Sequence, residues 1–478
     1  MLVASISGDF ETAKSAIVKA NQLSDLIELR IDLLESDEVS FVSKLKTLSK
    51  VPVIFTLRRM DQGGAFEGSE ELRKEKLLKL QTLSPSYIDL EYDCNFANEL
   101  DPSILLICSY HDFEKTPEDL SEILGKMSGF KSSIIKIATK ANSILDALRM
   151  LKFVQMHKVA GMCMGELGEI TRILGTVAGA PLVYSFIGKP TAPGQLSVQD
   201  LLEIYHFSSL SPKTKVYGVI GDPIHKSIGY LCHNKIFEAE KFDAVYVRML
   251  VKKPELSSFF KEVKSLPFNG LSVTMPLKEG VAAFADEIDE DVKEVGAYNT
   301  LFKREEIWRA TNTDGVGAID AIESHVKVQG KKMLIIGAGG AAKAIAYAGQ
   351  LRGASIIIAN RSENKGRALA DAVQGVYTPL TNLPDYDIIV NATSVGMSPD
   401  TNNVPIDEME IKENRVFFDV IMAPKETKFL RLGKERGGEV VYGYELYINQ
   451  AIRQQRCYLN RSFDEEKARK LIKGFIAL

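Results

Sequence analysis

A lysine interrupts an otherwise apolar segment of the sequence, in Ser132-Ser-Ile-Ile-Lys136-Ile-Ala138. Burial in such a segment disfavours the charged ammonium group, and the neutral amine is the nucleophile that forms a Schiff base with a carbonyl substrate. A protonated imine draws electrons from the neighbouring carbon, so a histidine such as His111 could remove a proton there. Glu91 could fix the tautomer of that imidazole and raise its basicity. Together these residues predict Schiff-base catalysis with a general base.

Charged residues also interrupt or end other apolar segments. Glu28, Arg30 and Asp32 alternate along one of them, which places all three on the same face of a strand. Arg58 ends the next apolar segment. Taken singly, each residue has a structural alternative. Glu28 and Arg30 could form an ion pair and Arg58 could be a surface charge, while His111 could be a loop residue that caps a helix.

A glycine-rich turn lies within Lys331–Ala342 and has the pattern G-x-G-x-x-A, starting at Gly337. Such glycines allow a tight turn and the close approach of a pyrophosphate to a helix N-terminus. The next apolar segment ends in Asn360-Arg361-Ser362, where an acidic residue would suit a free ribose 2′-hydroxyl and an arginine suits a 2′-phosphate. The motif therefore predicts NADP(H) rather than NAD(H); the alternative is that Arg361 is simply an exposed side chain.

Four polar clusters end apolar segments upstream of this turn: Gly221–Ser227, Ser272–Lys278, Gly296–Thr300 and Asn312–Gly315. Reduction of a ketone by hydride needs a proton donor at the forming alkoxide. Lys278, with Asp314 as its charge partner, could supply that proton. The alternative is an ordinary surface salt bridge between these two residues.

The elements that would position the first set of residues are eight short apolar segments. They are Leu2–Ser7, Leu26–Ile31, Pro52–Leu57, Tyr87–Tyr92, Ser103–Ser109, Ser133–Ala138, Val159–Met164 and Pro181–Phe186. Most gaps hold one helix and two short loops, as in parallel βαβ units, and only the fourth, 16 residues from start to start, is tight. Eight units predict a small (β/α)8 barrel, with its active site at the C-terminal ends of the strands, in preference to a doubly wound sheet.

The α/β pattern continues after Ser208–Lys215, which has the composition of a linker. We therefore expect a barrel over residues 1–207, a linker over 208–215, a substrate-binding domain over 216–318 and a Rossmann-like NADP domain over 319–444. Residues 445–478 are expected to pack back onto the substrate-binding domain.

Composition narrows the range of partners. The 478 residues include 59 Lys and Arg against 63 Asp and Glu, a net charge of −4 without a long basic run, which argues against nucleic acid or an anionic membrane surface. No apolar run approaches the roughly 20 residues that span a bilayer, and no secretory signal is visible. The five cysteines form no C-x-x-C pair, and the histidines have no metal-ligand spacing with them. We therefore expect a cytoplasmic protein that holds no metal.

Six motifs succeed one another in the first part of the chain: Glu28-Leu-Arg30-Ile-Asp32, Asp89-Leu-Glu91, Ser109-Tyr-His111-Asp-Phe113, Lys136-Ile-Ala138, Thr171-Arg172 and Ala192-Pro-Gly-Gln195. In this order they resemble type I 3-dehydroquinate dehydratase over residues 1 to about 207. The resemblance implies that Lys136 forms the Schiff base with the ring ketone, and that His111, oriented by Glu91, is the general base and acid. The substrate contacts that it implies are Glu28, Arg30, Arg58, Arg172, Thr191 and Gln195. Thr191 keeps the hydroxyl of the serine that is usual there.

Two further motifs, Asn391-Ala-Thr-Ser-Val-Gly-Met397 and Gly443…Gln450, complete a second pattern with the polar clusters and the glycine-rich turn. Residues 216–478 resemble shikimate dehydrogenase. This resemblance implies that Lys278 and Asp314 are catalytic. It assigns shikimate to Ser227, Thr274, Asn299 and Gln450. The NADP contacts that it implies are Gly337, Ala338, Gly339, Gly340, Ala341, Asn360, Arg361, Ser362, Asn391 and Thr393.

The second pattern departs from the family at two positions. Gly229 stands where a second serine is usual, two residues after Ser227, and Met422 stands where a tyrosine is usual. The loss of two hydroxyls should weaken the hold on the substrate carboxylate, and the missing serine side chain leaves room. Our hypothesis is that this site tolerates a ring with an extra hydroxyl at C1, such as quinate.

The two resemblances fit together, because the product of the first family, 3-dehydroshikimate, is the substrate of the second. The chain is therefore similar to bifunctional 3-dehydroquinate dehydratase/shikimate dehydrogenases of aromatic amino-acid biosynthesis. Two alternatives are a chain whose second half is degenerate, and a metabolite-sensing regulator derived from both enzymes. A regulator should have lost the reacting groups and gained a basic surface, whereas Lys136, His111, Lys278 and Asp314 are all present.

Overall fold

The computed structural model describes residues 1–225 and 227–476. The chain forms two compact units, Met1–Val216 with Asp243–Phe268, and Tyr217–Phe242 with Asn269–Leu478. Three residues of the predicted segments lie outside the described residues: Lys226 of the first polar cluster and residues 477 and 478 of the tail.

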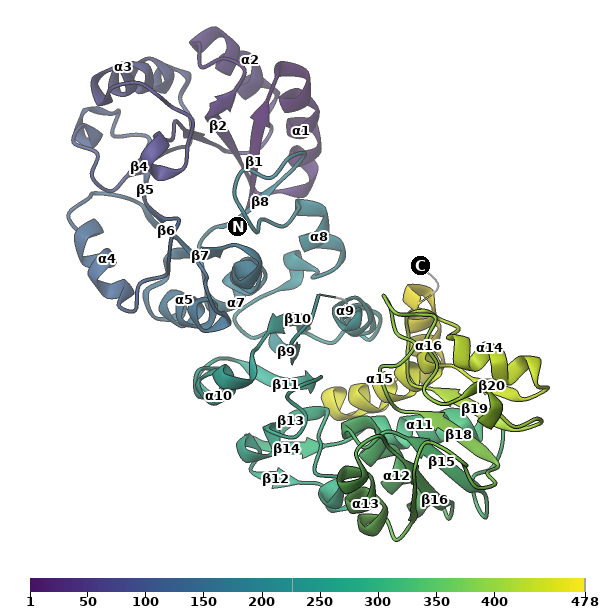
Figure 1. Ribbon diagram of the computed structural model, residues 1–478. Helices are drawn as coiled ribbons and strands as arrows, with labels where there is room; N and C mark the ends of the chain where they lie inside the picture. Colours follow the sequence, from purple (N-terminus) through teal and green to yellow (C-terminus); the bar gives the residue numbers. More distant parts are fainter. Residues whose placement is uncertain (226, 477–478) are drawn as a thin grey trace. The chain divides into compact units, whose positions relative to one another are not determined.

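Eight parallel strands build a barrel in the first unit (Figure 1). They are β1 Leu2–Gly8, β2 Leu26–Leu34, β3 Val53–Thr56, β4 Tyr87–Glu91, β5 Leu105–Asp112, β6 Ile134–Lys140, β7 Ala160–Met164 and β8 Val183–Phe186. The hydrogen-bonded order runs from β8 through β1 to β7, as sequential βα units require. Each predicted apolar segment contains or overlaps one strand, so the predicted fold class is confirmed.

Helices connect these strands, and polar caps begin many of them. They are α1 Phe10–Leu23, α2 Val39–Leu48, α3 Glu70–Leu80, α4 Leu120–Met127, α5 Ile144–His157, α6 Glu169–Ile173, α7 Gly175–Ala178 and α8 Val198–Glu203. The side chains of Asp9, Ser69 and Ser197 each accept a hydrogen bond from a first-turn amide and so satisfy a donor that the helix leaves free. The tight gap after β4 holds only a 3-10 turn, Ala97–Glu99, because 13 residues leave no room for a helix and two loops.

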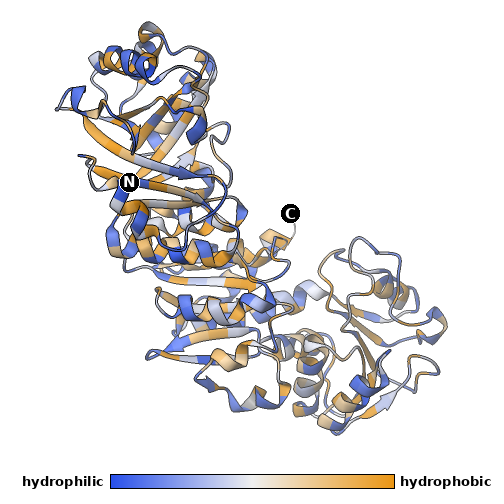
Figure 2. Ribbon diagram, turned by 60° about the vertical axis from the view of Figure 1, so that its left-hand side comes forward, coloured by the Kyte–Doolittle hydropathy of each residue, from blue (hydrophilic) through white to orange (hydrophobic). Residues whose placement is uncertain are grey.

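Side chains from the strands fill the barrel. One apolar cluster joins residues of seven strands, among them Val3 of β1, Met162 of β7 and Tyr184 of β8. The strands are accordingly the most hydrophobic elements in Figure 2, while the helices are mixed. Strands β7 and β8 are the two ends of the hydrogen-bonded order. Between them the barrel is closed by this side-chain packing.

A mixed six-stranded sheet follows, in the order β10-β9-β11-β13-β14-β12. Its strands are β9 Lys215–Gly221, β10 Ala244–Leu250, β11 Phe268–Val273, β12 Glu287–Ile288, β13 Thr300–Arg304 and β14 Ile307–Thr311. The associated helices are α9 Gly229–Ala239, α10 Leu256–Val263 and α11 Asp314–Glu323. The first strand begins at Lys215, the last residue of the segment predicted as a linker over 208–215.

The last sheet is parallel and doubly wound, in the order β17-β16-β15-β18-β19-β20. It comprises β15 Lys332–Ile336, β16 Ser355–Ala359, β17 Val376–Thr378, β18 Ile388–Asn391, β19 Val416–Asp419 and β20 Glu439–Val441, with α12 Gly340–Leu351, α13 Glu363–Ala372 and α14 Lys428–Glu435. Met333 and Ile335 face one apolar cluster and Leu334 and Ile336 the other. Both faces are therefore covered, which explains why β15 reads as a continuous apolar run.

Two helices, α15 Gly443–Leu459 and α16 Glu465–Ile476, end the described chain. Ile448 and Ile452 of α15 form an apolar cluster with Ile472 of α16 and with Cys232 and Ile236 of α9. The tail segment thus packs against an element that lies some 200 residues earlier in the sequence. Among the described residues, no helix combines the length and apolar character needed to cross a membrane.

We predict that Ile452→Ala lowers the unfolding temperature of the second unit without affecting the first. Ile452 is 1% exposed, and truncation of a buried isoleucine costs about 2–5 kcal/mol through lost contacts and the cavity left behind. Differential scanning calorimetry separates the transitions of the two units. The control is Arg456→Ala on the same helix, which removes only an exposed ion pair with Glu465 and should cost about 0–1 kcal/mol. Equal shifts in both variants would contradict the packing described.

Candidate active sites

A cavity of about 100 Å³ lies within the first unit. Its polar lining comes from several strands and the loops that follow them: Glu28, Arg30, Arg58, Gln62, His111, Lys136, Arg172, Tyr184, Thr191 and Gln195. Eight of the nine residues predicted as catalytic or substrate-binding in the first unit, all except Glu91, thus share one cavity. In a barrel of this kind, such a cavity is where chemistry is placed.

Lys136 lies inside this cavity and is 6% exposed. Its Nζ atom lies 2.9 Å from Oδ2 of Asp89 and 3.6 Å from Oε1 of Glu28. It also lies 4.0 Å from the centroid of the Tyr184 ring. Two carboxylates therefore compensate the charge of the amine, which an argument from desolvation alone did not anticipate.

The two carboxylates that contact Lys136 are ionised. Burial opposes ionisation of Asp89, but Arg58 and Lys136 outweigh it and hold the pKa of this carboxyl well below its usual range. Burial likewise opposes ionisation of Glu28, whereas Lys136 and Arg30 lower its pKa. Hydroxyl groups of Ser5 and Thr56 donate to the two oxygens of Glu28 and fix its orientation.

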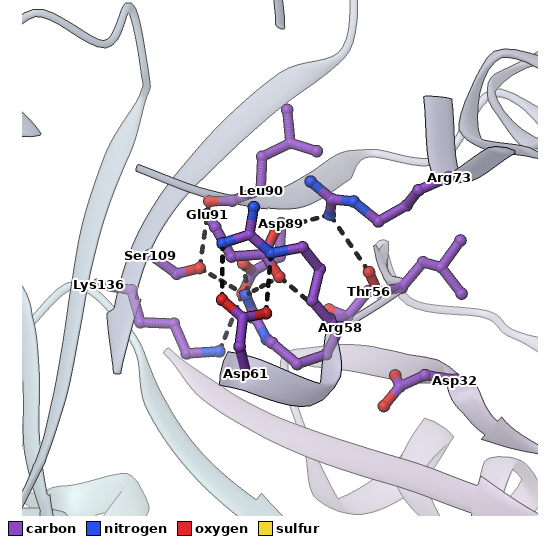
Figure 3. A network of polar contacts seen from close by, with 12 residues as sticks. Asp32, Thr56, Arg58, Asp61, Arg73, Asp89, Leu90, Glu91, Ser109 and Lys136 are labelled. Carbon is purple, nitrogen blue, oxygen red and sulfur yellow. Dashed lines mark hydrogen bonds and ion pairs between the residues drawn. The ribbon is translucent and has the colours of Figure 1, made fainter. Parts of the chain in front are cut away.

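Glu91 does not orient His111 in this structure, and our prediction of that pair is wrong. Arg58 and Arg73 contact the two oxygens of Glu91, at 3.1 and 2.6 Å, as part of the network in Figure 3. The Nδ1 atom of His111 is buried without a hydrogen-bond partner among the described residues. Glu91 therefore acts as a counter-ion for arginine, because each of its two oxygens contacts a buried guanidinium group.

His111 is a neutral imidazole at neutral pH. Burial, together with the positive charges of Arg58 and Lys136, holds the pKa of His111 well below its ordinary value of 6.5. The ring stacks on Phe113 with the planes 13° apart. A neutral imidazole can accept a proton, which is what a general base requires.

The three predicted cavity arginines differ in their partners. Arg30 pairs with Asp32 at 2.7 Å, and Arg58 pairs with Asp89 and Glu91. Arg172 forms no ion pair with any described residue; its Nη1 donates to the backbone carbonyl of Tyr184. Burial lowers the pKa of Arg172 to about 10, so it remains charged at neutral pH. A buried guanidinium without an acidic partner suits a carboxylate ligand.

The loop that carries Thr191 and Gln195 closes one side of the cavity. The Oε1 atom of Gln195 accepts hydrogen bonds from the amide and hydroxyl of Thr191 and from the amide of Ala192. Gly194 has a φ of +72°, and a Cβ there would lie 2.3 Å from the carbonyl oxygen of Gly165. Gln195 thus shapes the loop through its oxygen and leaves its amide nitrogen for a ligand.

A second site lies in the second unit, where Lys278 and Asp314 meet. Their Nζ and Oδ2 atoms are 2.6 Å apart. Asn299 donates to Oδ1 of Asp314 at 2.8 Å and to Oε1 of Gln450 at 3.3 Å. The side chains are 22% and 12% exposed at Lys278 and Asp314, so the pair is accessible from the cleft beside it.

This cleft, of about 470 Å³, joins the lysine to the glycine-rich turn. Its lining includes Thr274, Lys278, Gly339, Gly340, Ala341, Thr393 and Met422. Gly337 has a φ of +118°, and its amide donates to the carbonyl of Ala359. That bond places the turn beside Asn360 and Arg361, at the start of the loop after β16.

The residues predicted to hold the cofactor fall into two groups. Arg361 is exposed and makes no hydrogen bond or ion pair with a described residue, while the amide of Asn360 donates to the carbonyl of Ser362. Asn391 is fully buried: its amide donates to Val395 and Asp419, and its oxygen accepts from Thr393. Its side chain therefore shapes the loop that carries Thr393, which does line the cleft, and a contact of Asn391 with the cofactor stays a prediction.

Ser227 precedes α9, and its hydroxyl accepts a hydrogen bond from the amide of Gly229. Neither residue lines the cleft, whereas Met422 does. No group of three His, Cys, Asp or Glu side chains in the part of the chain described is placed to hold a metal ion.

Sequence reasoning missed Asp89, Ser109 and Arg73. Asp89 contacts Lys136 directly, Ser109 accepts from Nη1 of Arg58 at 2.7 Å, and buried Arg73 contacts Glu91 (Figure 3). A signal for Asp89 was present, because it lies two residues before Glu91 and so faces the same side of the strand. Arg73 lies on α3 with the charge pattern of a solvated helix, so no comparable signal marked it.

Comparisons with known proteins find three matching regions in the chain. The family described as type I 3-dehydroquinase matches residues 3–212, the shikimate dehydrogenase substrate binding domain matches residues 219–301, and the family of shikimate / quinate 5-dehydrogenase matches residues 320–427.

Similar whole chains combine the same parts. The chloroplastic bifunctional 3-dehydroquinate dehydratase/shikimate dehydrogenase of Arabidopsis thaliana is 35% identical over 91% of this chain and 78% of its own. The shikimate biosynthesis protein AroDE of Chlamydia pneumoniae is 32% identical over the full length of both. A crystal structure of a shikimate dehydrogenase in complex with NADP+ matches 56% of this chain and 97% of its own, with 31% identity and a TM-score of 0.53.

Fold and site thus define a two-part α/β enzyme, in which a barrel with a buried lysine is joined to a dinucleotide-binding dehydrogenase. The chain belongs to the family of bifunctional 3-dehydroquinate dehydratase/shikimate dehydrogenases.

We predict that the His111 imidazole stays neutral as the pH falls through 6.5, because burial and two neighbouring cations oppose its protonation. His325 provides the internal contrast. Burial opposes its protonation too, but its hydrogen bonds to Glu445 and Glu439 raise its pKa above the ordinary value. NMR titration of isotope-labelled histidines measures both, with His111→Gln identifying the signal. A His111 midpoint at or above 6.5 would contradict the environment described.

Proposed function

We propose that the barrel dehydrates 3-dehydroquinate to 3-dehydroshikimate and that the second part reduces 3-dehydroshikimate to shikimate. The observation that carries the proposal is the enclosed amine of Lys136, which lines a cavity together with a neutral histidine and an arginine without an acidic partner. Membership of the family supports both activities.

In the first reaction, the amine of Lys136 attacks the ring ketone, after a neighbouring carboxylate has accepted its proton. The carboxylate returns that proton to the hydroxyl of the adduct, which leaves as water. The resulting protonated imine lies beside Asp89 and Glu28, which compensate its positive charge. His111 removes a proton from the adjacent methylene carbon, and the electrons expel the C1 hydroxyl, which takes that proton and leaves as water. A second water then hydrolyses the imine and restores Lys136.

The substrate carboxylate is held by Arg172 in this proposal. Its charge has no protein counter-ion among the described residues, whereas Arg30 and Arg58 are already paired. A bidentate guanidinium matches both carboxylate oxygens. Arg58 acts mainly on the enzyme itself, because it orients Asp89 and Glu91.

In the second reaction, bound NADPH supplies a hydride to the ketone carbon. The residues that would hold it are the glycines of the turn over 337–340, with Arg361 at the 2′-phosphate; an N-terminal helix end and an unpaired arginine fit a phosphorylated dinucleotide. Lys278 donates a proton to the forming alkoxide, and Asp314 holds the ammonium in place. Asn299 and Gln450 would position the hydroxyls of the ring.

We propose the following division of labour along the chain. Residues 1–207 form the dehydratase, 216–318 with the tail over 445–478 bind shikimate, and 319–444 bind NADP. The hydrogen bond between Asn299 and Gln450 supports the place of the tail in this division. Five cysteines without disulfides support a reducing compartment, which we take to be the cytoplasm.

Lys136→Ala should abolish dehydration and leave reduction intact, while Lys278→Ala should do the converse, because each residue serves only its own site. Enone absorbance follows the first reaction and NADPH absorbance the second. Borohydride with 3-dehydroquinate should add a covalent mass at Lys136, which peptide mass spectrometry detects. The matched control is Lys140→Ala at the exposed end of the same strand, which should keep the adduct. Loss of both activities in one folded variant would contradict two independent sites.

Arg361→Ala should raise the KM for NADPH about tenfold and change the KM for NADH little, because only NADPH carries the 2′-phosphate. Charge-assisted contacts are worth about 1.5–3 kcal/mol, which sets this scale. Arg367→Ala, on an exposed arginine of α13 that pairs with Glu363, is the matched control. A similar change for both cofactors would show that Arg361 does not read the phosphate.

Gly229 leads to a prediction on specificity. The chain should oxidise quinate as well as shikimate, and Gly229→Ser should lower kcat/KM for quinate and raise it for shikimate, since the added hydroxyl fills the space that an extra C1 hydroxyl would need. Steady-state kinetics with both substrates checks this. Undetectable quinate turnover by the unsubstituted chain rejects the hypothesis.

A further inference from the structure

Several buried polar atoms in the barrel cavity have no hydrogen-bond partner among the described residues. They are Oε1 of Gln62, Nδ1 of His111, Nε of Arg172 and the hydroxyl of Tyr184, and all four residues line the cavity. Such atoms are uncommon in folded proteins and call for a ligand or water. The roles of His111 and Arg172 are proposed above, whereas the hydroxyl of Tyr184 has none.

Tyr184 is held firmly in place. It lies on β8, is 2% exposed and belongs to the apolar cluster inside the barrel. Its backbone carbonyl accepts a hydrogen bond from Arg172 at 3.2 Å, and the centroid of its ring lies 4.0 Å from Nζ of Lys136. The ring therefore lies next to the reacting amine, and the backbone of the same residue contacts the proposed carboxylate anchor.

The phenol is a hydrogen-bond donor under all ordinary conditions. Burial, and the charges of Glu28 and Asp89, raise the pKa of Tyr184 well above 10, so the hydroxyl stays protonated. A buried hydroxyl without a partner destabilises a protein, whereas a phenylalanine would pack in the same space without that cost. Packing alone therefore does not account for the hydroxyl.

We propose that the Tyr184 hydroxyl is a substrate-binding group, which donates a hydrogen bond to the ring hydroxyl next to the ketone of 3-dehydroquinate. This inference rests on the proposed dehydration. In the imine, the former ketone carbon is bonded to Nζ, and that atom lies over the face of the Tyr184 ring, 4.0 Å from its centroid. Of the two ring carbons that flank it, one is the methylene that His111 deprotonates and carries no oxygen. The other carries a hydroxyl, which is the acceptor that the geometry leaves for Tyr184.

The first test is Tyr184→Phe, which keeps the ring beside Lys136 and removes only the hydroxyl. We expect the KM for 3-dehydroquinate to rise about 3- to 10-fold, as the loss of one hydrogen bond predicts, and the reduction of 3-dehydroshikimate to stay unchanged. Tyr110→Phe is the matched control, because Tyr110 lies on β5 of the same barrel and does not line the cavity. An unchanged KM in Tyr184→Phe overturns the inference, even if the variant unfolds at a higher temperature.

The second test identifies the substrate atom by comparing two compounds, first with the unsubstituted chain and then with Tyr184→Phe. With the unsubstituted chain, an analogue that lacks the hydroxyl next to the ketone should have a KM about 3- to 10-fold higher than 3-dehydroquinate. In Tyr184→Phe the two compounds should have similar KM values, because the bond is already absent. If the variant discriminates between them as strongly as the unsubstituted chain does, the hydroxyl contacts another atom and the inference fails.

Failure of the proposed function gives a different result. If the unsubstituted chain does not dehydrate 3-dehydroquinate, the proposed reaction is wrong. If it does and Tyr184→Phe has the same KM, only the role of Tyr184 is wrong.

Discussion

The barrel depends on the balance of charge around one buried amine. Lys136 lies between Asp89 and Glu28, and each carboxylate is itself held, Asp89 by Arg58 and Glu28 by hydroxyl groups of neighbouring strands. An isolated buried charge costs several kcal/mol, and removal of one partner of a buried pair leaves the other uncompensated. The network therefore keeps a cation inside an apolar barrel and provides the same compensation to a protonated imine.

The two lysines proposed as catalytic show how burial divides their roles. Both contact a carboxylate, Lys136 at 2.9 Å and Lys278 at 2.6 Å. Lys136 is enclosed by strands and by the ring of Tyr184, which suits a covalent bond to a substrate that has displaced water. Lys278 opens onto a cleft beside the glycine-rich turn, which suits the transfer of a proton to a substrate that lies next to a cofactor. The two lysine–carboxylate pairs thus serve different chemistry, because one is enclosed and the other is open to a cleft.

Much of this arrangement could be predicted from the sequence, because strand periodicity and the order of motifs are local properties. The eight strands, the glycine-rich turn after β15 and the Lys278–Asp314 pair follow from residue spacing. The partners of Glu91 could not be predicted, since Arg73 reaches it from α3 and the preference for two guanidinium groups over His111 is set by the fold. Burial of Asn391 likewise depends on Asp419 of the neighbouring strand, 28 residues later in the chain.

The hydrogen bonds from α15 to the middle of the chain have a consequence for synthesis on the ribosome. Gln450 accepts from Asn299, and Gln454 donates to the backbone of Asn299 and accepts from Ser272. All of the cavity residues of the barrel, by contrast, precede residue 200. The barrel site can therefore form while translation continues. The second site forms only after about 150 residues beyond Asn299 have been synthesised.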